Sequence, residues 1–316
     1  MPCPDRITSP PGHAARDNRP MQVALLGLGL IGGSIARALR AGNGAGEHVE
    51  RIVAWTPSGV GPRLAFEAGV IDAVPASPAE VVDGADLVVL AAPPLECLGL
   101  LAVLAPLRDR LAPNGVVTDV ASTKERIVSF ATGVGLPFVG GHPMAGTEAT
   151  GFAASSADLF RDRPWVVVPG SSSPAGGVER IEALARACGA RPMRLDAVTH
   201  DRAVAAVSHV PLVLAVALVE AVIGPPEGPD RPDWALEAKL ASTGWASMTR
   251  LALGSPEMAA GIAETNDPAI IAGLRDVRAA IDAWIGELES DVHAPPLVDR
   301  FKAARDRLAR SDGAPG

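Results

Sequence analysis

The chain is 316 residues long, 48% hydrophobic and 20% charged, and it carries a formal net charge of −8 with a pI near 5.3. At about 100–200 residues per domain, this length predicts two domains, and the apolar content excludes disorder over most of the chain. Because nucleic-acid binding needs a basic surface, the acidic balance argues against a nucleic-acid partner. It leaves room for a small anionic substrate held by one or two arginines.

The N-terminus and the cysteines bear on the compartment. Residues 1–20 hold five prolines and no apolar segment of the signal-peptide kind, so we expect a disordered tail there. Cys3, Cys97 and Cys188 are far apart and odd in number, which favours neither a disulfide framework nor a metal centre and fits a cytoplasmic protein. The longest apolar run, Val210 to Ile223, is interrupted by a glutamate and is too short to span a bilayer, so we expect no membrane partner.

Apolar runs alternate with helix-like stretches in the first half of the chain. The runs predict strands at Met21–Gly27, Arg51–Trp55, Ala85–Ala91, Gly115–Val120, Leu136–Gly140 and Trp165–Pro169. The stretches predict helices at Gly33–Ala41, Pro62–Ala68, Pro78–Val82, Leu95–Leu104 and Lys124–Phe130. This alternation indicates a parallel sheet covered on both faces, and near-continuous Val and Leu runs are typical of strands buried on both sides.

A turn-rich break at 170–176 ends this pattern, and the chain beyond it is expected to be helical. Helices are predicted at Gly177–Ala187, Ala197–Ile223, Trp234–Leu253, Pro256–Ile262, Pro268–Ser290 and Pro295–Arg310. The stretch Ala203–Val222 is apolar nearly all round, which favours a central or interface helix over a surface helix. We therefore expect a sheet domain over 21–170 and a helical domain over 171–316, with a homodimer formed through the helical half.

A glycine-rich turn follows the first strand and opens the first helix. Its G-x-G-x-x-G motif consists of Gly27, Leu28, Gly29, Leu30, Ile31 and Gly32. In this context the first glycine permits the tight turn, the second lets the backbone approach a pyrophosphate, and the third lets helix and strand pack closely. The helix N-terminus offers unpaired N–H groups to the phosphates. The motif predicts a dinucleotide site for NAD or NADP; a glycine-rich turn without a ligand is the alternative.

The end of the second strand bears on which dinucleotide binds. NAD enzymes usually hold the ribose with an acidic residue here, but this strand continues into Thr56 and Ser58. Thr56 lacks the charge that would repel a 2′-phosphate, and Ser58 and Arg63 could donate to one, so NADP is open beside NAD. In the alternative, Thr56 only caps a turn and NAD binds without an acid. Pro93, just after the third strand, is also assigned to the cofactor site.

Three polar patches interrupt apolar sequence where a cleft is expected. DVASTK over 119–124 ends a strand, and ligands sit beyond the carboxyl ends of strands in such sheets. GGHPMAGTE over 140–148 holds His142 between a glycine pair and a proline, and imidazole suits proton transfer because it titrates near neutral pH. SHVP over 208–211 lies inside the apolar helix, where a polar pair is costly unless it is bonded or lines a site. Taken singly, each patch could hold satisfied core groups.

Taken together, these motifs resemble those of the prephenate/arogenate dehydrogenase family. The order GLGLIGGS, DVASTK, GGHPMAGTE and SHVP, followed by Met248-Thr249-Arg250, carries the resemblance from about Met21 to Asn266, and GGHPMAG is its most specific part. The resemblance implies a Rossmann-type doubly wound α/β domain followed by an all-α dimerisation domain. It also implies oxidative decarboxylation of prephenate to 4-hydroxyphenylpyruvate in tyrosine biosynthesis, with hydride passed to a nicotinamide.

The resemblance also implies roles for single residues. The position of His142 hydrogen-bonds the ring hydroxyl and draws off its proton, and that of Ser122 orients this histidine and touches the nicotinamide region. Arg250 matches an arginine that grips a substrate carboxylate, which suits a bidentate guanidinium. The other substrate-pocket positions are Ser208, His209, Thr147 and Glu148. We expect His142 and Arg250 to face one cleft, and we expect no metal, since no metal-spaced His/Cys set is visible.

One departure from the family pattern and two other classes stay open. Leu212 stands where prephenate-preferring members usually have the last histidine of SHLPH, so arogenate, or both compounds, is open as the substrate beside prephenate. A dehydrogenase of the β-hydroxyacid or imine-reducing kind would be expected to carry a catalytic lysine where this chain has Ser208 and His209. A dinucleotide-sensing binding protein is the other class, but it would give His142 and Arg250 no function.

Overall fold

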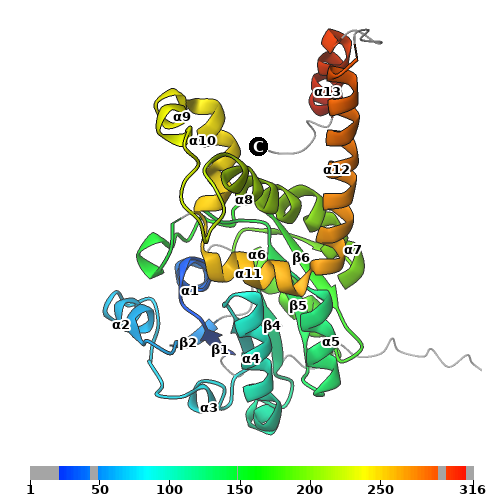
Figure 1. The fold of residues 1–316 in the computed structure, drawn as a ribbon. Coiled ribbons are helices and arrows are strands. Elements are labelled where there is room, and N and C mark those ends of the chain that lie inside the picture. The colour runs from blue at the N-terminus through cyan, green and yellow to red at the C-terminus, as the bar shows by residue number, and fades with distance from the viewer. Residues whose placement is uncertain (1–20, 43–48, 148, 291–296, 311–316) are drawn as a thin grey trace, which may run out of the picture.

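A computed structural model describes residues 21–42, 49–147, 149–290 and 297–310 (Figure 1). The tail over 1–20 that we expect to be disordered, and the predicted pocket residue Glu148, lie outside the described residues. Four parallel strands form the first sheet in the order β2-β1-β3-β4. Their bounds are β1 Met21–Leu26, β2 Val49–Trp55, β3 Leu87–Leu90 and β4 Val116–Asp119.

This sheet is buried on both faces because side chains alternate along each strand. In β1, Val23 and Leu25 belong to one apolar core, whereas Ala24 and Leu26 belong to a second core on the opposite face. Helix α1 supplies the first core, and α4 and α5 supply the second. The helices of this region are α1 Leu30–Ala41, α2 Val60–Glu67, α3 Pro78–Val81, α4 Pro94–Leu104 and α5 Glu125–Gly133, with the 3-10 turn η1 Ala105–Arg110. The predicted Rossmann-type domain is confirmed.

A second sheet of three strands lies beside β4. Its strands are β5 Val139–Pro143, β6 Pro164–Pro169 and β7 Arg191–Arg194, in the order β5-β6-β7. A parallel bridge between Val117 and Phe138 connects it to the first sheet. Strand β6 runs antiparallel to β5, which differs from the fully parallel sheet that we expected. The reason lies in the connection, which contains the short 3-10 turn η2 Phe152–Ala154 and no described crossover helix, and a parallel pairing would need a crossover.

The sheet domain continues beyond the predicted boundary at residue 170, so that boundary needs correction. Helix α6, Gly177–Ala187, packs on β6 and β7, and β7 pairs in parallel with β6. The sequence RPMR of β7 does not predict a strand, because it has no apolar run and no clear alternation. The helical half begins with α7 at Ala197, not at residue 171.

Helices form the described remainder of the chain. They are α7 Ala197–Val204, the π turn η3 Ala205–His209, α8 Val210–Val222, α9 Trp234–Leu240, α10 Thr243–Thr249, the 3-10 turn η4 Arg250–Leu253, α11 Pro256–Thr265, α12 Asp267–Leu288 and α13 Leu297–Arg310. The single helix predicted over Trp234–Leu253 is broken at Ala241 and Ser242, which have extended backbones. In Figure 1, α9 and α10 and the upper part of α12 project away from the sheets.

The long apolar helix changes its winding at the SHVP motif. Pro211 has no N–H to donate to the carbonyl four residues earlier, and its ring crowds that carbonyl. The wider π turn directly before it accommodates this conflict, and such turns often occur at functional sites. Two neighbouring residues of this π turn have different surroundings: Ser208 is exposed, whereas His209 is buried.

Little of this helix is covered within one chain. The continuous helix Ala197–Val222 has 26 residues, and its most apolar 18-residue window has a mean hydropathy of 2.0 and is 28% buried. By length and composition alone the whole helix could cross a membrane, a test that the core helix of a soluble protein also passes, so the expected absence of a membrane partner stays a prediction. The apolar run from Val210 is the C-terminal part of this helix, which begins with α7. Within α8, Val210 and Ala215 are buried, most of the other apolar residues are half-buried, and Val216 is exposed.

Polar contacts join the two halves beside the end of β4. The hydroxyl oxygens of Thr123 and Thr265 lie 2.7 Å apart, and Arg126 forms an ion pair with Asp267 at 2.9 Å. Helix α11 packs against α4. The DVASTK segment therefore lies at the junction of the sheet domain and the helical half.

Candidate active site

The glycine-rich turn has the shape that a dinucleotide needs. Gly27 has a φ of +104°, and a Cβ there would lie 2.1 Å from the carbonyl oxygen of Ala91. A Cβ at Gly32 would lie 2.3 Å from the carbonyl oxygen of Gly27, whereas one at Gly29 would meet no atom within 4 Å. The turn is thus tightly packed at Gly27 and Gly32, whereas Gly29 has open space beside it. No side chain caps the N-terminus of α1, and its first turn has no acidic residue, so its N–H groups suit a pyrophosphate.

The sheet order brings several predicted cofactor-site residues to one edge. Because β1, β3 and β4 are parallel neighbours, the residues after each strand meet at the same carboxyl edge. These are the glycine turn, the half-buried Pro93 that precedes α4, and Ser122. After β2, the hydroxyl oxygen of Thr56 accepts a hydrogen bond from the backbone N–H of Gly59 at 3.1 Å, so Thr56 does cap a turn. Ser58 is exposed on the same turn.

Strand β5 brings His142 against the end of β4, and its glycine pair makes this possible. A Cβ at Gly141 would lie 2.7 Å from the carbonyl oxygen of Asp119, and one at Gly140 would lie 3.1 Å from Cδ of Lys124. Asp119 and Lys124 are fully buried and form an ion pair beneath this point. The backbone N–H of Gly141 also donates to Asp119 at 3.2 Å. The glycines and the ion pair therefore fix the strand that carries His142.

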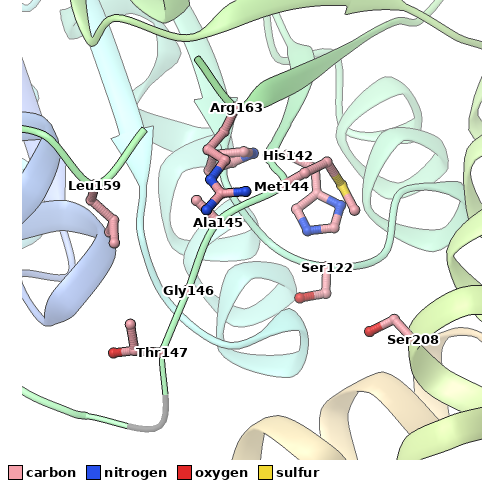
Figure 2. Close-up of a pocket in the computed structure, with 10 residues that line it drawn as sticks. Ser122, His142, Met144, Ala145, Gly146, Thr147, Leu159, Arg163 and Ser208 are labelled. Atoms are coloured by element: carbon pink, nitrogen blue, oxygen red, sulfur yellow. The ribbon is translucent and has the colours of Figure 1, made fainter. Parts of the chain in front are cut away.

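A cavity of about 510 Å³ opens beside His142. Its lining residues come from both halves of the chain and are Ser122, His142, Pro143, Met144, Ala145, Gly146, Thr147, Leu159, Arg163 and Ser208. Figure 2 shows the imidazole above the Ser122 hydroxyl, with Ser208 facing them from the helical half and Thr147 on the opposite side. Four predicted site residues, His142, Ser122, Thr147 and Ser208, are thus brought together.

Burial keeps the imidazole of His142 uncharged. Its side chain is 8% exposed, and this burial, with smaller contributions from His200, Lys124 and His209, holds its pKa well below the usual value of 6.5. The ring is therefore uncharged at neutral pH and able to accept a proton. A hydroxyl on a small molecule in the cavity would be the natural proton donor.

Two predicted substrate residues lie away from this cavity. His209 is buried, and its Nδ1 lies 3.0 Å from the side-chain nitrogen of Asn266. Within one chain it is therefore a hydrogen-bonded core residue. Burial lowers the pKa of His209 to about 4. Arg250 is exposed on η4, which packs against α8, and it does not line the cavity. One chain therefore does not bring Arg250 into the lining of the cavity beside His142, and the expectation that both residues face one cleft stays a prediction.

Sequence reasoning missed several polar residues near the site. The Nε2 of His200 lies 2.8 Å from Nδ1 of His142, and the Nδ1 of His200 lies 2.7 Å from Oδ1 of Asp201. Arg163, directly before β6, lines the cavity. The polar pair His200-Asp201 at the start of an apolar helix carries the same signal that singled out Ser208-His209. Arg163 has no comparable signal in the sequence.

The fold and this site define a nicotinamide-dependent oxidoreductase, with a dinucleotide-binding domain and a pocket that the helical half helps to line. The family model for the nucleotide-binding domain of prephenate dehydrogenase matches residues 36–194, and the model for its dimerization domain matches 196–303. The chain therefore belongs to the prephenate dehydrogenase family. The two models meet at the start of α7, where the structure also divides.

Similar proteins span nearly the whole chain. The prephenate dehydrogenase of Bacillus subtilis is 31% identical over 294 residues, which cover 90% of this chain and 74% of that one. A crystal structure of prephenate dehydrogenase from Aquifex aeolicus with hydroxyphenyl propionate and NAD+ has a TM-score of 0.77 at 25% identity, covering 92% of this chain and 98% of that one. The arogenate dehydrogenase of Synechocystis has a TM-score of 0.71 at 28% identity, covering 91% and 100%.

Proposed function

We propose that the chain catalyses the oxidative decarboxylation of prephenate to 4-hydroxyphenylpyruvate in tyrosine biosynthesis. The observation that carries this proposal is the neutral, buried His142 in the wall of a cavity at the carboxyl edge of a dinucleotide-binding sheet. Membership of the family and the likeness to prephenate dehydrogenases support it. When bound, the nicotinamide accepts the hydride from the carbinol carbon of the ring.

The residues of this chain handle the proton and the orientation. The ring O–H bond breaks and its proton goes to Nε2 of His142, while the C–H electron pair leaves as hydride. The bond to the ring carboxylate then breaks, carbon dioxide leaves, and its electron pair makes the ring aromatic. The phenolate oxygen takes back the proton from His142. Ser122 and Ser208 supply hydroxyls to the wall of the same cavity and orient the substrate.

The assignment of a substrate carboxylate to Arg250 requires the assembled dimer. Arg250 is exposed beside α8 and lines no part of this cavity in one chain, so we propose that it reaches a substrate carboxylate only in a homodimer. Thr147 at the cavity and Glu148, outside the described residues, stay assigned to the pocket mouth. Arg163 lines the same cavity and adds a positive charge that suits an anionic substrate.

A homodimer through the helical half accounts for the exposed apolar face. Val207 is 74% exposed, Val216 is 37% exposed and Leu253 is 80% exposed, all on or beside α8. A second copy that covers this face would remove the apolar surface from water, and the matched dimerization domain supports this partner. We propose a cytoplasmic homodimer that binds neither membrane nor nucleic acid.

Arogenate is the second candidate substrate, and one position favours it. Leu212, where a histidine is usual in prephenate-preferring members, packs against the small core of Ala205, Ile262 and Ile270. A leucine offers the substrate side chain no hydrogen bond, so it gives no handle on the keto group that distinguishes prephenate. The likeness to an arogenate dehydrogenase supports the same alternative.

The cofactor is NAD or NADP, and the preference between them is part of the proposal. The absence of an acid at Thr56 removes a charge that would repel a 2′-phosphate, and the exposed Ser58 and Arg63 lie on the turn and helix that follow β2. We propose that NADP is accepted beside NAD.

A two-by-two kinetic comparison tests the proposal. Prephenate and arogenate are each offered with NAD+ and with NADP+, and the formation of reduced nicotinamide is followed. We expect at least one combination to give rapid reduction that depends on the enzyme. No reduction with either substrate at high enzyme concentration would reject the proposed function, and a preference for arogenate would select the second candidate.

A further inference from the structure

A line of buried hydrogen bonds runs from the cavity into the junction of the two halves. His142 is bonded through Nδ1 to Nε2 of His200 at 2.8 Å, and Nδ1 of His200 is bonded to Oδ1 of Asp201 at 2.7 Å. His200 is 0% exposed and Asp201 is 2% exposed. The two residues belong to α7, whereas His142 belongs to β5, so this line crosses from one half of the chain to the other.

The surroundings of Asp201 fix the direction of these hydrogen bonds. Its Oδ1 accepts the backbone N–H of Lys124 at 2.7 Å, and its Oδ2 accepts that of Glu125 at 2.8 Å, which binds it to the first turn of α5. A carboxylate that accepts from two backbone N–H groups acts as an acceptor toward a third partner. The Nδ1 of His200 is therefore the donor and carries the hydrogen.

This tautomer of His200 also determines which nitrogen of His142 carries a hydrogen. A neutral His200 with its hydrogen on Nδ1 has an unprotonated Nε2, which can only accept. The Nδ1 of His142 must then carry a hydrogen and donate it to His200. We infer that His200 and Asp201 are positioning residues that hold His142 in the tautomer whose Nε2 is unprotonated and faces the cavity. This inference rests on the proposed function for its catalytic meaning.

The charges around His142 are consistent with this role. The cations that face it are Lys124, from the loop before α5, and Arg163 at the cavity. Lys124 is paired with the buried Asp119, and His209 on η3 is held neutral by burial. The carboxylate of Asp201 is the negative group at the far end of the line. When His142 takes up a proton, its Nδ1–H bond to His200 becomes charge-assisted and stronger, which stabilises the imidazolium.

The test compares two substitutions at His200 that differ in one property. The side-chain oxygen of a glutamine reaches the place of Nε2 and can accept from His142, whereas leucine has a similar size and cannot. We expect His200→Gln to keep kcat within roughly threefold of the parent. We expect His200→Leu to lower kcat by at least about tenfold, but by no more than the roughly 10²–10⁴-fold that the positioned acid–base group itself supplies. KM and cofactor affinity should change little in both.

A matched control separates positioning from stability. Ser173 donates to the carbonyl of Phe138 at 2.9 Å and accepts from the N–H of Gly170 at 2.9 Å, near the start of β5 and away from the cavity. Ser173→Ala should lower the thermal midpoint without lowering kcat. If both His200→Leu and Ser173→Ala lowered kcat in proportion to their loss of thermal stability, the positioning role would be wrong.

A spectroscopic readout keeps this inference separate from the proposed reaction. In protein labelled with 15N-histidine, NMR should show His142 of the parent protonated on Nδ1 and unprotonated on Nε2, and His200→Leu should raise the population of the other tautomer. This measurement needs no substrate, so it stands even if neither prephenate nor arogenate is oxidised. A hydrogen on Nε2 of His142 in the parent would overturn the inference.

Discussion

The two halves of the molecule differ in how much of their apolar surface one chain can bury. The sheet domain encloses two large cores, one on each face of the β2-β1-β3-β4 sheet, whereas the described helical half has a small core around Ala205, Ile262 and Ile270. The sheet domain also holds the dinucleotide turn and His142. One chain therefore completes the packing of the sheet domain, whereas the helical half leaves apolar surface for the proposed second copy to cover.

The sheet domain is tested most strongly by His142→Asn. Because the imidazole is the proposed proton acceptor, we expect kcat to fall by about 10²–10⁴-fold. Cofactor affinity should stay close to that of the parent, because His142 is not part of the glycine turn. Steady-state kinetics and a fluorescence titration with reduced nicotinamide measure the two quantities. Activity within a few-fold of the parent would show that another group accepts the proton.

The helical half is tested by Arg250→Ala. Loss of a charge-assisted bond to a carboxylate costs about 1.5–3 kcal/mol, so KM should rise by about 10–100-fold while kcat changes less. Mixed dimers extend this test. If Arg250 acts across the dimer, combining His142→Asn subunits with Arg250→Ala subunits restores a complete site and recovers activity. No recovery in verified mixed dimers would place Arg250 outside the partner's site.

The need for a second copy is tested by a charge on the exposed face of α8. Val216→Asp should weaken the dimer by about tenfold or more, because burying a charged group against an apolar face is unfavourable. Val103→Asp on α4 is the matched control, since Val103 is an exposed valine on a helix of the sheet domain. Light scattering at several protein concentrations reports the oligomeric state. Equal behaviour of the two variants would argue against a dimer through α8.

The buried histidines predict how stability depends on pH. The pKa of His142 lies well below 6.5 and that of His209 is about 4, both because burial disfavours the charged ring. Below pH 6.5 the unfolded chain therefore binds more protons than the folded chain, so the free energy of unfolding should fall as the pH drops toward 4. Denaturant titrations over this range measure the slope. The slope should be smaller in His142→Asn, and an unchanged slope would mean that His142 titrates normally.

The smallest expected effect concerns cofactor choice. Thr56→Asp places a negative charge where a 2′-phosphate would lie, at a cost of about 1 kcal/mol near the surface. The ratio of kcat/KM for NADP to that for NAD should fall by about five- to tenfold. Thr56→Asn is the uncharged control of the same shape. If both variants shifted the ratio equally, loss of the turn cap by Thr56 would explain the change instead of charge.

The sequence predicts those parts of the fold and site that depend on neighbouring residues. The strand–turn–helix around Gly27 and the glycine pair before His142 have local signals, so their positions can be predicted. The strand β7 has no local pattern and forms because β6 offers it an edge. The bond between His142 and His200 joins residues far apart in the chain, and periodicity carries no information about such contacts. The place of Arg250 depends on how η4 packs on α8, which no motif reveals.

Product analysis tests the central claim most directly. The enzyme is mixed with prephenate, or with arogenate, and the oxidised cofactor, and reduced nicotinamide, carbon dioxide and the phenolic product are measured together. The account predicts equal molar amounts of all three from at least one substrate, and loss of all three in His142→Asn. Reduction of the cofactor without release of carbon dioxide, or no reaction with either substrate, would contradict it.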